Sequence, residues 1–403
     1  MIDDIAQRLH DTALFLETHR ALWEQRPFVG LPVPWEKDWP ELSKSLRHIS
    51  PDQLEKVEND PVAFLAKSAV APELSETLMR LSDVPVLPGA RVSRIARQRG
   101  VDERKGQQIA HFVPVMADRF PMGVARWVDW CAGKGHLGVT VHDRFNHPVT
   151  CVEINPDLVV QGNRAMQEAN RKVVFVAADV LSKPLSAVLS RDTGVVALHA
   201  CGHLNSRLFE LAIEHRPAFL AVVPCCYQRI DGMHFEPLST AGRHTGLTFT
   251  RHQLRLPALD EVKTTASKRQ FRKREMAFRQ GMDLLLRQAT GQDAYTPLGK
   301  IPPMIVRGSF EKFCRFAAQN KGLPLPRRID WSAAEQAGWT RQHLVSALSI
   351  SRQLFRRVLE IWLFLDRVAY LEENGYQVTY GTFCPREITP RNLMLLATAS
   401  EVY

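Results

Sequence analysis

The feature that most constrains the fold is a turn of small residues at positions 129–137, with the sequence DWCAGKGHL. An apolar lead, Trp127 and Val128, stops at the acidic Asp129, and the residues after Gly135 read as the start of a helix. Small residues are needed where backbone approaches a ligand closely and the N-terminus of the next helix points at that ligand. The spacing differs from the dinucleotide fingerprint G-x-G-x-x-G, and no P-loop lysine–serine pair follows it. The turn predicts the first strand–turn–helix of a nucleotide-type α/β unit, with an ordinary strand-to-helix turn as the alternative.

Residues 126–227 alternate short apolar strands with helical stretches, which is typical of a parallel sheet whose crossovers are helices. Strands are predicted at residues 127–129, 149–153, 173–177, 194–198 and 219–223. A long helix is predicted over residues 351–371. Two antiparallel closing strands are predicted over residues 377–383 and 392–398. The sequence therefore predicts an α/β fold with a Rossmann-like, seven-stranded sheet.

The chain of 403 residues is long enough for one large domain with additions, or for two to three ordinary domains. Four regions are predicted, namely an N-terminal helical region at 1–95, a cofactor-binding core at 96–228, a basic and mainly helical insertion at 229–350, and a helix with the final strand pair, completing the core, at 351–403.

Acidic residues stand at the ends of two consecutive predicted strands. Glu153 ends the second strand, 18 residues after Gly135, where its carboxylate can accept both hydroxyls of a ribose. Asp179 follows the third strand, where it can accept a hydrogen bond from an adenine amino group. Together with the glycine turn, which resembles motif I of S-adenosylmethionine-dependent methyltransferases, these residues predict S-adenosylmethionine as the cofactor, with NAD as the main competitor. The predicted cofactor contacts are Asp129, Cys131, Gly133, Lys134, Gly135, His136, Leu137, Glu153, Asp179 and His199.

Several short motifs together resemble the methyltransferase-like protein 25 family, also described as containing a ribosomal-RNA adenine dimethylase-like domain. They lie at residues 31–35, 129–137, 198–202, 224–227, 365–372 and 383–392. The resemblance implies a class I methyltransferase fold that uses S-adenosylmethionine, and it implies no firm substrate. Two family carboxylates are replaced, by His203 and by Cys384, so a general base would have to come from elsewhere, for example His199 or His203.

Candidate catalytic residues follow the fourth and fifth strands. They are His199, Cys225, Cys226 and Tyr227. A cysteine thiolate could attack a pyrimidine carbon and activate it for methylation. The alternative is that residues 224–227 pack a tight loop, because cysteine is often buried without reactivity. Tyr227 could in that case stack on the acceptor.

The charge of the chain favours a phosphate-bearing partner, since lysine and arginine exceed aspartate and glutamate by nine. A basic run at residues 91–105 could face a phosphate chain or the methionine carboxylate, or be a solvated loop. Lys268 and Arg272 lie in a second basic stretch, which would track an RNA backbone or be a solvated helix face. Arg391 and Asn392 could face the substrate or cap the sheet.

These features predict an S-adenosylmethionine-dependent methyltransferase that acts on RNA, either tRNA or ribosomal RNA. The alternatives are a protein methyltransferase and an inactive, cofactor-binding factor associated with RNA or ribosomes. An odd number of cysteines, seven, fits a reducing compartment, so we expect a cytoplasmic protein. No C-x-x-C pair is present, so no metal site is expected, and no apolar run is long enough to predict a membrane span.

Overall fold

The computed structural model describes residues 5–89, 102–121, 123–182, 188–259 and 265–400. The chain divides into two compact units. Unit 1 comprises Met1–Thr18, Leu81–Val262 and Arg356–Tyr403, and unit 2 comprises His19–Arg80 and Lys263–Phe355. Among the described residues, every helix is too short or too polar to traverse a bilayer.

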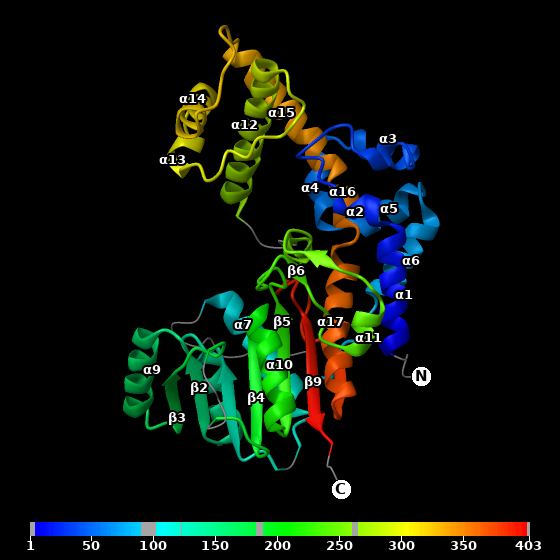
Figure 1. Ribbon diagram of the computed structural model, residues 1–403. Coiled ribbons are helices and arrows are strands. Elements are labelled where there is room, and N and C mark those ends of the chain that lie inside the picture. Colours follow the sequence, from blue (N-terminus) through cyan, green and yellow to red (C-terminus); the bar gives the residue numbers. More distant parts are fainter. Residues whose placement is uncertain (1–4, 90–101, 122, 183–187, 260–264, 401–403) are drawn as a thin grey trace. The chain divides into compact units, whose positions relative to one another are not determined.

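Unit 1 is built on a seven-stranded sheet with the order β3-β2-β1-β4-β5-β9-β8, most of which can be followed in Figure 1. The first five strands in the chain run parallel, and β9 is antiparallel to both of its neighbours. The predicted seven-stranded α/β sheet is thus confirmed. The strands are β1 Arg126–Trp130, β2 Val149–Glu153, β3 Val173–Ala177, β4 Thr193–Cys201, β5 Phe219–Cys225, β8 Tyr376–Thr382 and β9 Leu393–Ala399.

Strands β4 and β5 extend beyond their predicted ends, to Cys201 and Cys225. The reason is local, because the ladder between them shifts register after Leu198 and resumes where Cys201 faces Cys225. A bulge of this kind re-aims side chains at the end of a strand. Parallel strands all end at the same edge of a sheet, so this extension lengthens the edge at which a ligand is expected.

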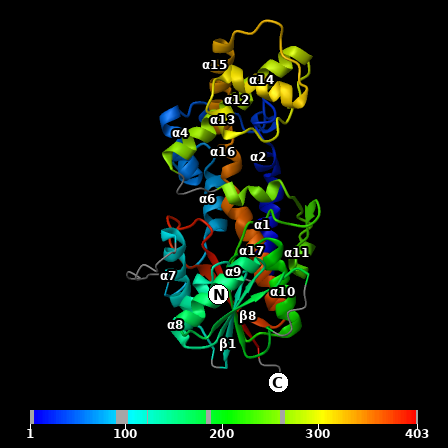
Figure 2. The same cartoon turned by 90° about the vertical axis from the view of Figure 1, so that its left-hand side faces the viewer.

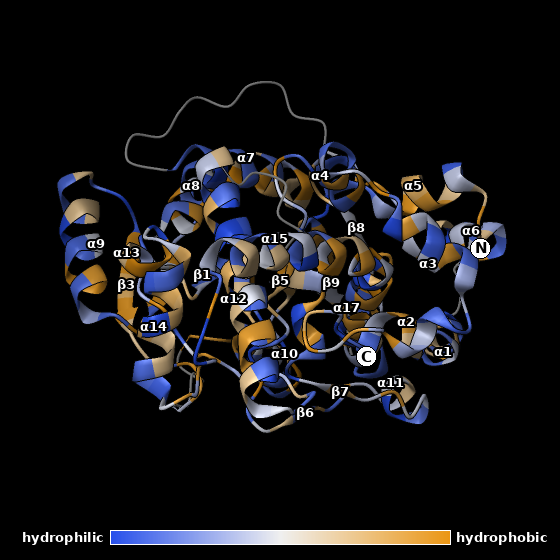
Figure 3. Cartoon of the chain, turned by 90° about the horizontal axis from the view of Figure 1, so that it is seen from above, coloured by the Kyte–Doolittle hydropathy of each residue, from blue (hydrophilic) through white to orange (hydrophobic). Residues whose placement is uncertain are grey.

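Helices cover both faces of the sheet, and Figure 2 shows α8 on one side and α10 on the other. Apolar residues of α7, α8 and α9 pack with the sheet in one buried cluster that includes Phe112, Val141 and Phe175. Helices α10 and α17 contact the sheet through β4 and β8. The helices are α1 Ile5–Thr18, α7 Glu103–Ala117, α8 His136–Phe145, α9 Pro156–Glu168, α10 His203–His215 and α17 Arg356–Glu373. Figure 3 shows alternating hydrophobic and hydrophilic bands on α9, as expected of an amphipathic helix.

The long helix predicted over 351–371 is interrupted. A short helix, α16 (Ile350–Gln353), ends before Leu354 and Phe355, and α17 begins at Arg356. Both intervening side chains are almost completely buried.

Short elements occupy residues 229–259, where the sequence analysis found no regular pattern. They are β6 His234–Phe235, α11 Thr240–His244, β7 Phe249–Thr250 and the 3-10 helices Gln253–Arg255 and Pro257–Leu259. The segment is attached to α17 through Asp366, whose carboxylate accepts hydrogen bonds from the backbone N–H groups of Leu238 and Ser239 and from the Ser239 hydroxyl. Such short elements rely on tertiary contacts of this kind because they have few internal hydrogen bonds.

Unit 2 is helical. Helices α12 and α15 cross closely at Gly338, where a Cβ atom would lie 2.6 Å from the carbonyl oxygen of Ala277. A separate apolar cluster that includes Phe278, Phe310 and Phe313 forms its core. Its elements are α2 Arg20–Glu24, the 3-10 helix Pro34–Glu36, α3 Pro40–Arg47, α4 Pro51–Asn59, α5 Pro61–Ser68, most of α6 Pro72–Ser82, α12 Ala266–Thr290, α13 Pro303–Val306, α14 Phe310–Lys321, α15 Trp331–Leu348 and α16.

Candidate functional site

The glycine turn lies between β1 and α8 and uses the left-handed backbone region three times. Cys131, Gly133 and Gly135 have φ values of +57°, +60° and +71°. A Cβ atom on Gly135 would lie 2.3 Å from the Phe175 ring, so this position needs glycine for space as well as for conformation. Cys131 thus adopts a backbone conformation that glycine adopts most readily. Lys134 sits between the two glycines, and His136 and Leu137 open α8.

Asp129 supports this turn from inside the sheet. Its Oδ2 accepts a 2.8 Å hydrogen bond from the backbone N–H of Gly138, and its side chain is buried. Burial raises the pKa of Asp129 to about 7. Burial also raises the pKa of the neighbouring Cys131 thiol to about 12, which keeps that thiol neutral at physiological pH. Both residues therefore shape the turn without presenting a full charge close to Gly133.

Glu153 lies at the end of β2, beside the turn. Its Oε2 accepts from the N–H of Gly133 at 2.8 Å, and its Oε1 accepts from the N–H of Asn155 at 2.9 Å. Each carboxylate oxygen has a second lone pair, so the group can still accept from a diol. Asp179 Oδ1 accepts from the N–H of Leu181 at 3.0 Å, on the neighbouring strand end. The structure thus brings the two predicted acidic residues to one edge, beside the exposed apolar side chain of Ile154.

Helix α7 contributes two residues whose roles the sequence did not reveal. Gln108 is buried, and its Oε1 lies 2.5 Å from Nε2 of His199 at the end of β4. Lys105, one turn earlier, acts electrostatically on Asp129, His136 and His199, and it contributes to the lowered pKa values of both histidines. The only available signal was the basic run at 91–105, which ends at Lys105. Of that run, Arg91, Arg94, Arg97 and Arg99 lie outside the described residues.

His199 is held neutral. Burial lowers the pKa of His199 to about 4, and the charges of Lys105 and Arg391 lower it further, whereas a Cys226 thiolate opposes them. Its backbone has a φ of +69°, an unusual conformation for a side chain of this size. Neutral imidazole donates its Nε2–H to Gln108 and keeps a lone pair on Nδ1.

The lowered pKa of His199 predicts a pH-dependent stability. Because the unfolded imidazole takes up its proton near pH 6.5 and the folded one near pH 4, stability is lost as the pH falls through this window, by roughly 3 kcal/mol in total. His199→Asn removes the titration and keeps a residue that tolerates positive φ. Urea unfolding between pH 7 and 4 should show a shallower decline for His199→Asn than for the wild type. The exposed His244→Asn is the control, and a decline equal in all three proteins would contradict this assignment.

The predicted catalytic cysteines lie at the end of β5. Cys225 is almost completely buried, whereas Cys226 is partly accessible. Hydrogen bonds from the Cys201 and Cys225 thiols, then the Arg391 and Arg229 guanidiniums, hold the pKa of Cys226 well below its usual range. The pKa of Cys225 is raised, chiefly by the same thiol hydrogen bonds. Of the two predicted nucleophiles, only Cys226 therefore has both access and thiolate character.

Tyr227 is placed differently from the prediction. Its ring is 3% exposed, and the Arg367 guanidinium lies over it with its carbon 4.9 Å from the ring centroid. Burial raises the pKa of the Tyr227 hydroxyl above its usual range. A ring enclosed in this way cannot stack on a substrate, so the predicted contact is wrong. Tyr227 instead anchors the loop after β5 to α17.

The loop between β8 and β9 brings Arg391 toward Cys226 at the end of β5. Arg391 acts electrostatically on Cys226, and its Nη2 donates to the carbonyl of Ala258 at 2.5 Å. Asn392, however, is buried, donates to the carbonyl of Cys384 and accepts from Arg357. Both ends of its amide are therefore used within the protein, which contradicts a substrate contact and gives it a structural role.

A cavity of about 540 Å³ is lined in part by the segment that follows β5, residues 228–230. Three exposed arginines, Arg229, Arg251 and Arg255, line it together with Gln228, Ile230, Ala258 and Leu259. The N–H of Arg229 donates to the Cys226 carbonyl at 3.0 Å, so the cavity begins three residues after the sheet ends. Arginine is the side chain best suited to bind phosphate through paired N–H groups. The arrangement can therefore hold an anionic group next to the strand ends.

The basic stretch on α12 belongs to unit 2. Lys268 and Arg272 are both exposed on its first turns. Farther along α12, the Arg279 side chain pairs with Glu275 at 2.7 Å and also donates to the Gly299 carbonyl. The exposed basic side chains Lys268 and Arg272 thus lie at the N-terminal end of the helix.

His203 is at one of the two positions where the sequence departs from the pattern of the family that it resembles. Its Nε2 lies 2.7 Å from Oδ2 of Asp231. A carboxylate thus lies beside position 203, although it comes from a different part of the chain. Cys384, the second replacement, is buried.

Comparisons with known proteins agree with this architecture. Residues 104–233 match a family model described as a methyltransferase domain, and this stretch spans the glycine turn, Glu153, Asp179 and the cysteines. The chain is 26% identical over 181 residues to a mouse glutathione S-transferase C-terminal domain-containing protein, covering 43% of this chain and 26% of that protein. The human protein of the same description is 30% identical over 129 residues, covering 31% and 19%. The chain therefore spans about a quarter or less of the length of these relatives.

Solved structures that match part of this chain include methyltransferases. One is a putative RNA methyltransferase from Pyrococcus horikoshii, with 18% identity and a TM-score of 0.26, covering 37% of this chain and 72% of that chain. Another is geranyl diphosphate C-methyltransferase from Streptomyces coelicolor, solved with S-adenosyl-L-homocysteine, with 14% identity and a TM-score of 0.22, covering 38% and 65%. Neither likeness carries an argument about the substrate of this chain.

Proposed function

We propose that this protein transfers the methyl group of S-adenosylmethionine to RNA. The methyltransferase-domain match and the seven-stranded sheet support the reaction class. The cavity lined by Arg229, Arg251 and Arg255 carries the proposal for the acceptor, because it offers three cations to a phosphate backbone beside the strand ends. We also assign the chain to the methyltransferase-like protein 25 family as part of this proposal, on the motifs that contain the glycine turn and the cysteines.

The residues at the edge of the sheet fit the cofactor. The left-handed glycines and the N-terminus of α8 would hold the methionine part of the cofactor. Lys105, which acts electrostatically on Asp129 and His136, would neutralise the carboxylate of that methionine part. Glu153 would accept the ribose hydroxyls, and Asp179 would accept from the adenine amino group. The exposed Ile154 offers an apolar surface to the base. When bound, S-adenosylmethionine supplies an electrophilic methyl group.

The chain itself would mainly orient the acceptor. An acceptor atom with a free lone pair needs alignment more than acid–base help. If a proton has to leave, Nδ1 of neutral His199 is the available base at this edge, since Gln108 occupies its Nε2. A covalent step through Cys226 would instead serve a pyrimidine carbon, and comparing Cys226→Ser with the wild type for turnover at unchanged cofactor affinity tests that route.

Transfer to RNA can be tested with radiolabelled S-adenosylmethionine and total RNA or total protein from cells that lack this gene. We expect label in RNA. The double variant Arg251→Gln/Arg255→Gln should lower incorporation at least about 10-fold at subsaturating RNA. It should also reduce the slope of log affinity against log salt by about two, since two phosphate contacts are lost.

The matched control is Arg126→Gln/Arg171→Gln. Both of these arginines sit in exposed ion pairs at the opposite edge of the sheet, with Asp192 and Asp143, so their loss should cost little. Label found only in protein would overturn the RNA proposal. So would equal incorporation by the two double variants. Binding of S-adenosylmethionine and RNA without any incorporation would instead point to an inactive RNA-associated factor.

A further inference from the structure

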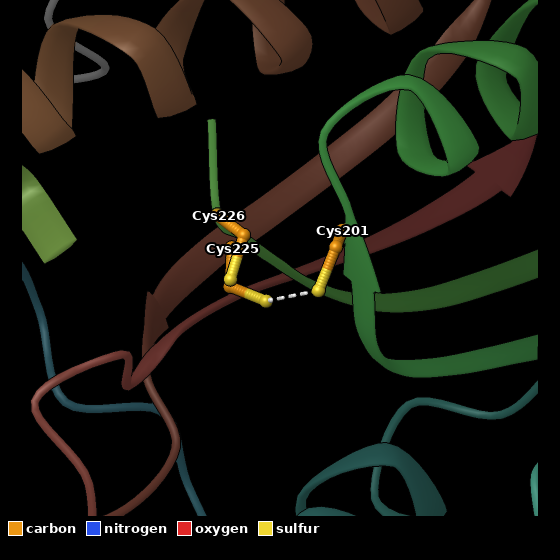
Figure 4. Close-up of side chains that lie close together, drawn as sticks. All are labelled: Cys201, Cys225 and Cys226. Atoms are coloured by element: carbon orange, nitrogen blue, oxygen red, sulfur yellow. Dashed lines mark hydrogen bonds between the residues drawn. The ribbon is translucent and has the colours of Figure 1, made fainter. Parts of the chain in front are cut away.

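Three thiols converge at the carboxyl ends of β4 and β5, as Figure 4 shows. They belong to Cys201, Cys225 and Cys226, and their sulfur atoms all lie within 4.8 Å of one another. The Sγ atoms of Cys201 and Cys225 are 3.4 Å apart. In the described part of the chain, this is the one group of three or more His, Cys, Asp or Glu side chains close enough to share a metal ion.

The backbone is shaped to produce this convergence. Side chains of adjacent residues in a regular strand point to opposite faces, so in such a strand Cys225 and Cys226 could not bind the same metal ion. Cys226 instead has a φ of +51°, which turns the chain. The register shift after Leu198 places Cys201 opposite Cys225. Gly202 then approaches Arg229 so closely that a Cβ atom on Gly202 would lie 2.1 Å from the carbonyl oxygen of Arg229.

The spacing suits a soft metal ion. With Zn–S bonds of about 2.3 Å in a tetrahedron, the sulfur atoms of a zinc site are roughly 3.8 Å apart. The separation of 3.4 Å between Cys201 and Cys225 is close to this value, and no pair of the three sulfur atoms is more than 4.8 Å apart. Thiolates select zinc and related soft cations over the hard cations Mg²⁺ and Ca²⁺. The guanidiniums of Arg229 and Arg391, which act on the Cys226 thiolate, would offset the negative charge of a three-thiolate site.

We propose that Cys201, Cys225 and Cys226 form a binding site for a thiophilic cation of the Zn²⁺ class, with one coordination position left for water or another exchangeable ligand. Binding converts two thiols, the Cys226 thiolate and one Zn²⁺ into a zinc tristhiolate and releases two protons to solvent. The sequence predicted no metal site, because these ligands come from two strand ends rather than from a C-x-x-C pair. This site does not rest on the proposed methyl transfer, and coordination would exclude Cys226 as a free nucleophile.

The test uses the full chain, reduced, stripped of metal and kept anaerobic. Titration with Co²⁺ should produce a thiolate-to-cobalt charge-transfer band and the visible spectrum of a tetrahedral ion, saturating at one equivalent. Zn²⁺ should displace it, and protein purified without chelator should carry one zinc per chain. Cys201→Ser, Cys225→Ser and Cys226→Ser should each weaken binding at least about 100-fold, while Cys314→Ser, at a buried cysteine in unit 2, should not.

Failure of the reduced wild-type chain to bind Co²⁺ or Zn²⁺ at micromolar concentration would overturn the proposal, and this measurement needs no variant to fold. A disulfide between Cys201 and Cys225 in that same non-binding protein would assign the cluster to redox chemistry instead. Equal loss of binding in Cys314→Ser would also overturn it. Calorimetry with S-adenosylmethionine on the same samples keeps the two proposals apart, because cofactor affinity should be unaffected by loss of this metal site.

Discussion

Replacing Glu153 with alanine is expected to weaken S-adenosylmethionine binding at least about 100-fold. The carboxylate accepts the backbone N–H groups of Gly133 and Asn155, and so connects the glycine turn to the end of β2. Hydrogen bonds to a charged group contribute about 1.5–3 kcal/mol each, and the ribose contacts are lost as well. Isothermal titration calorimetry measures the effect directly.

Glu168→Ala is the matched control, because Glu168 is an exposed glutamate on α9 whose partner is Arg164. The affinity of Glu168→Ala for S-adenosylmethionine should stay within about twofold of the wild type, since an exposed ion pair contributes little to stability. Glu153→Gln should fall between the two, because an amide oxygen still accepts one of the backbone bonds. Unchanged affinity in Glu153→Ala would remove this glutamate from the cofactor site.

Replacing Asp366 with alanine should destabilise the protein by about 3–5 kcal/mol. Asp366 is fully buried on α17, accepts three hydrogen bonds from Leu238 and Ser239, and lies beside the buried Arg367. Its loss leaves two backbone N–H groups and a hydroxyl without their acceptor, and removes the carboxylate beside the Arg367 guanidinium. Chemical denaturation monitored by circular dichroism should show a lower transition midpoint for unit 1.

Glu373 provides a control on the same helix. Its carboxylate accepts from the N–H groups of Thr240 and Ala241, in the same segment that Asp366 holds, but it is exposed to water. Water can replace the lost acceptor, so Glu373→Ala should cost only about 1 kcal/mol. Equal destabilisation by the two substitutions would show that burial does not set the contribution of Asp366.

The sheet and its cofactor edge could be predicted because their signals are local. Apolar runs of strand length separated by helical stretches indicate parallel strands, and the residues at the strand ends must then meet at one edge. Glu153 and Asp179 were found in this way, and the glycines identify a turn whose backbone only small residues adopt readily. The motif at 365–372 could be recognised in the sequence. The hydrogen bonds of Asp366 could not be predicted from it, because their donors lie about 130 residues away in the chain.

The sequence by itself therefore determined where the strands of the α/β core lie along the chain and the position of the glycine turn, since both depend on periodicity and on residues close together in the chain. Only the tertiary structure decided which side chains share a site. Gln108 reaches His199, Tyr227 is enclosed by Arg367, and Cys201 meets Cys225 and Cys226. These contacts depend on a register shift, a left-handed residue and helix packing. None of these features produces a repeating pattern of residues in the sequence, because each is set by atoms that are distant in the chain.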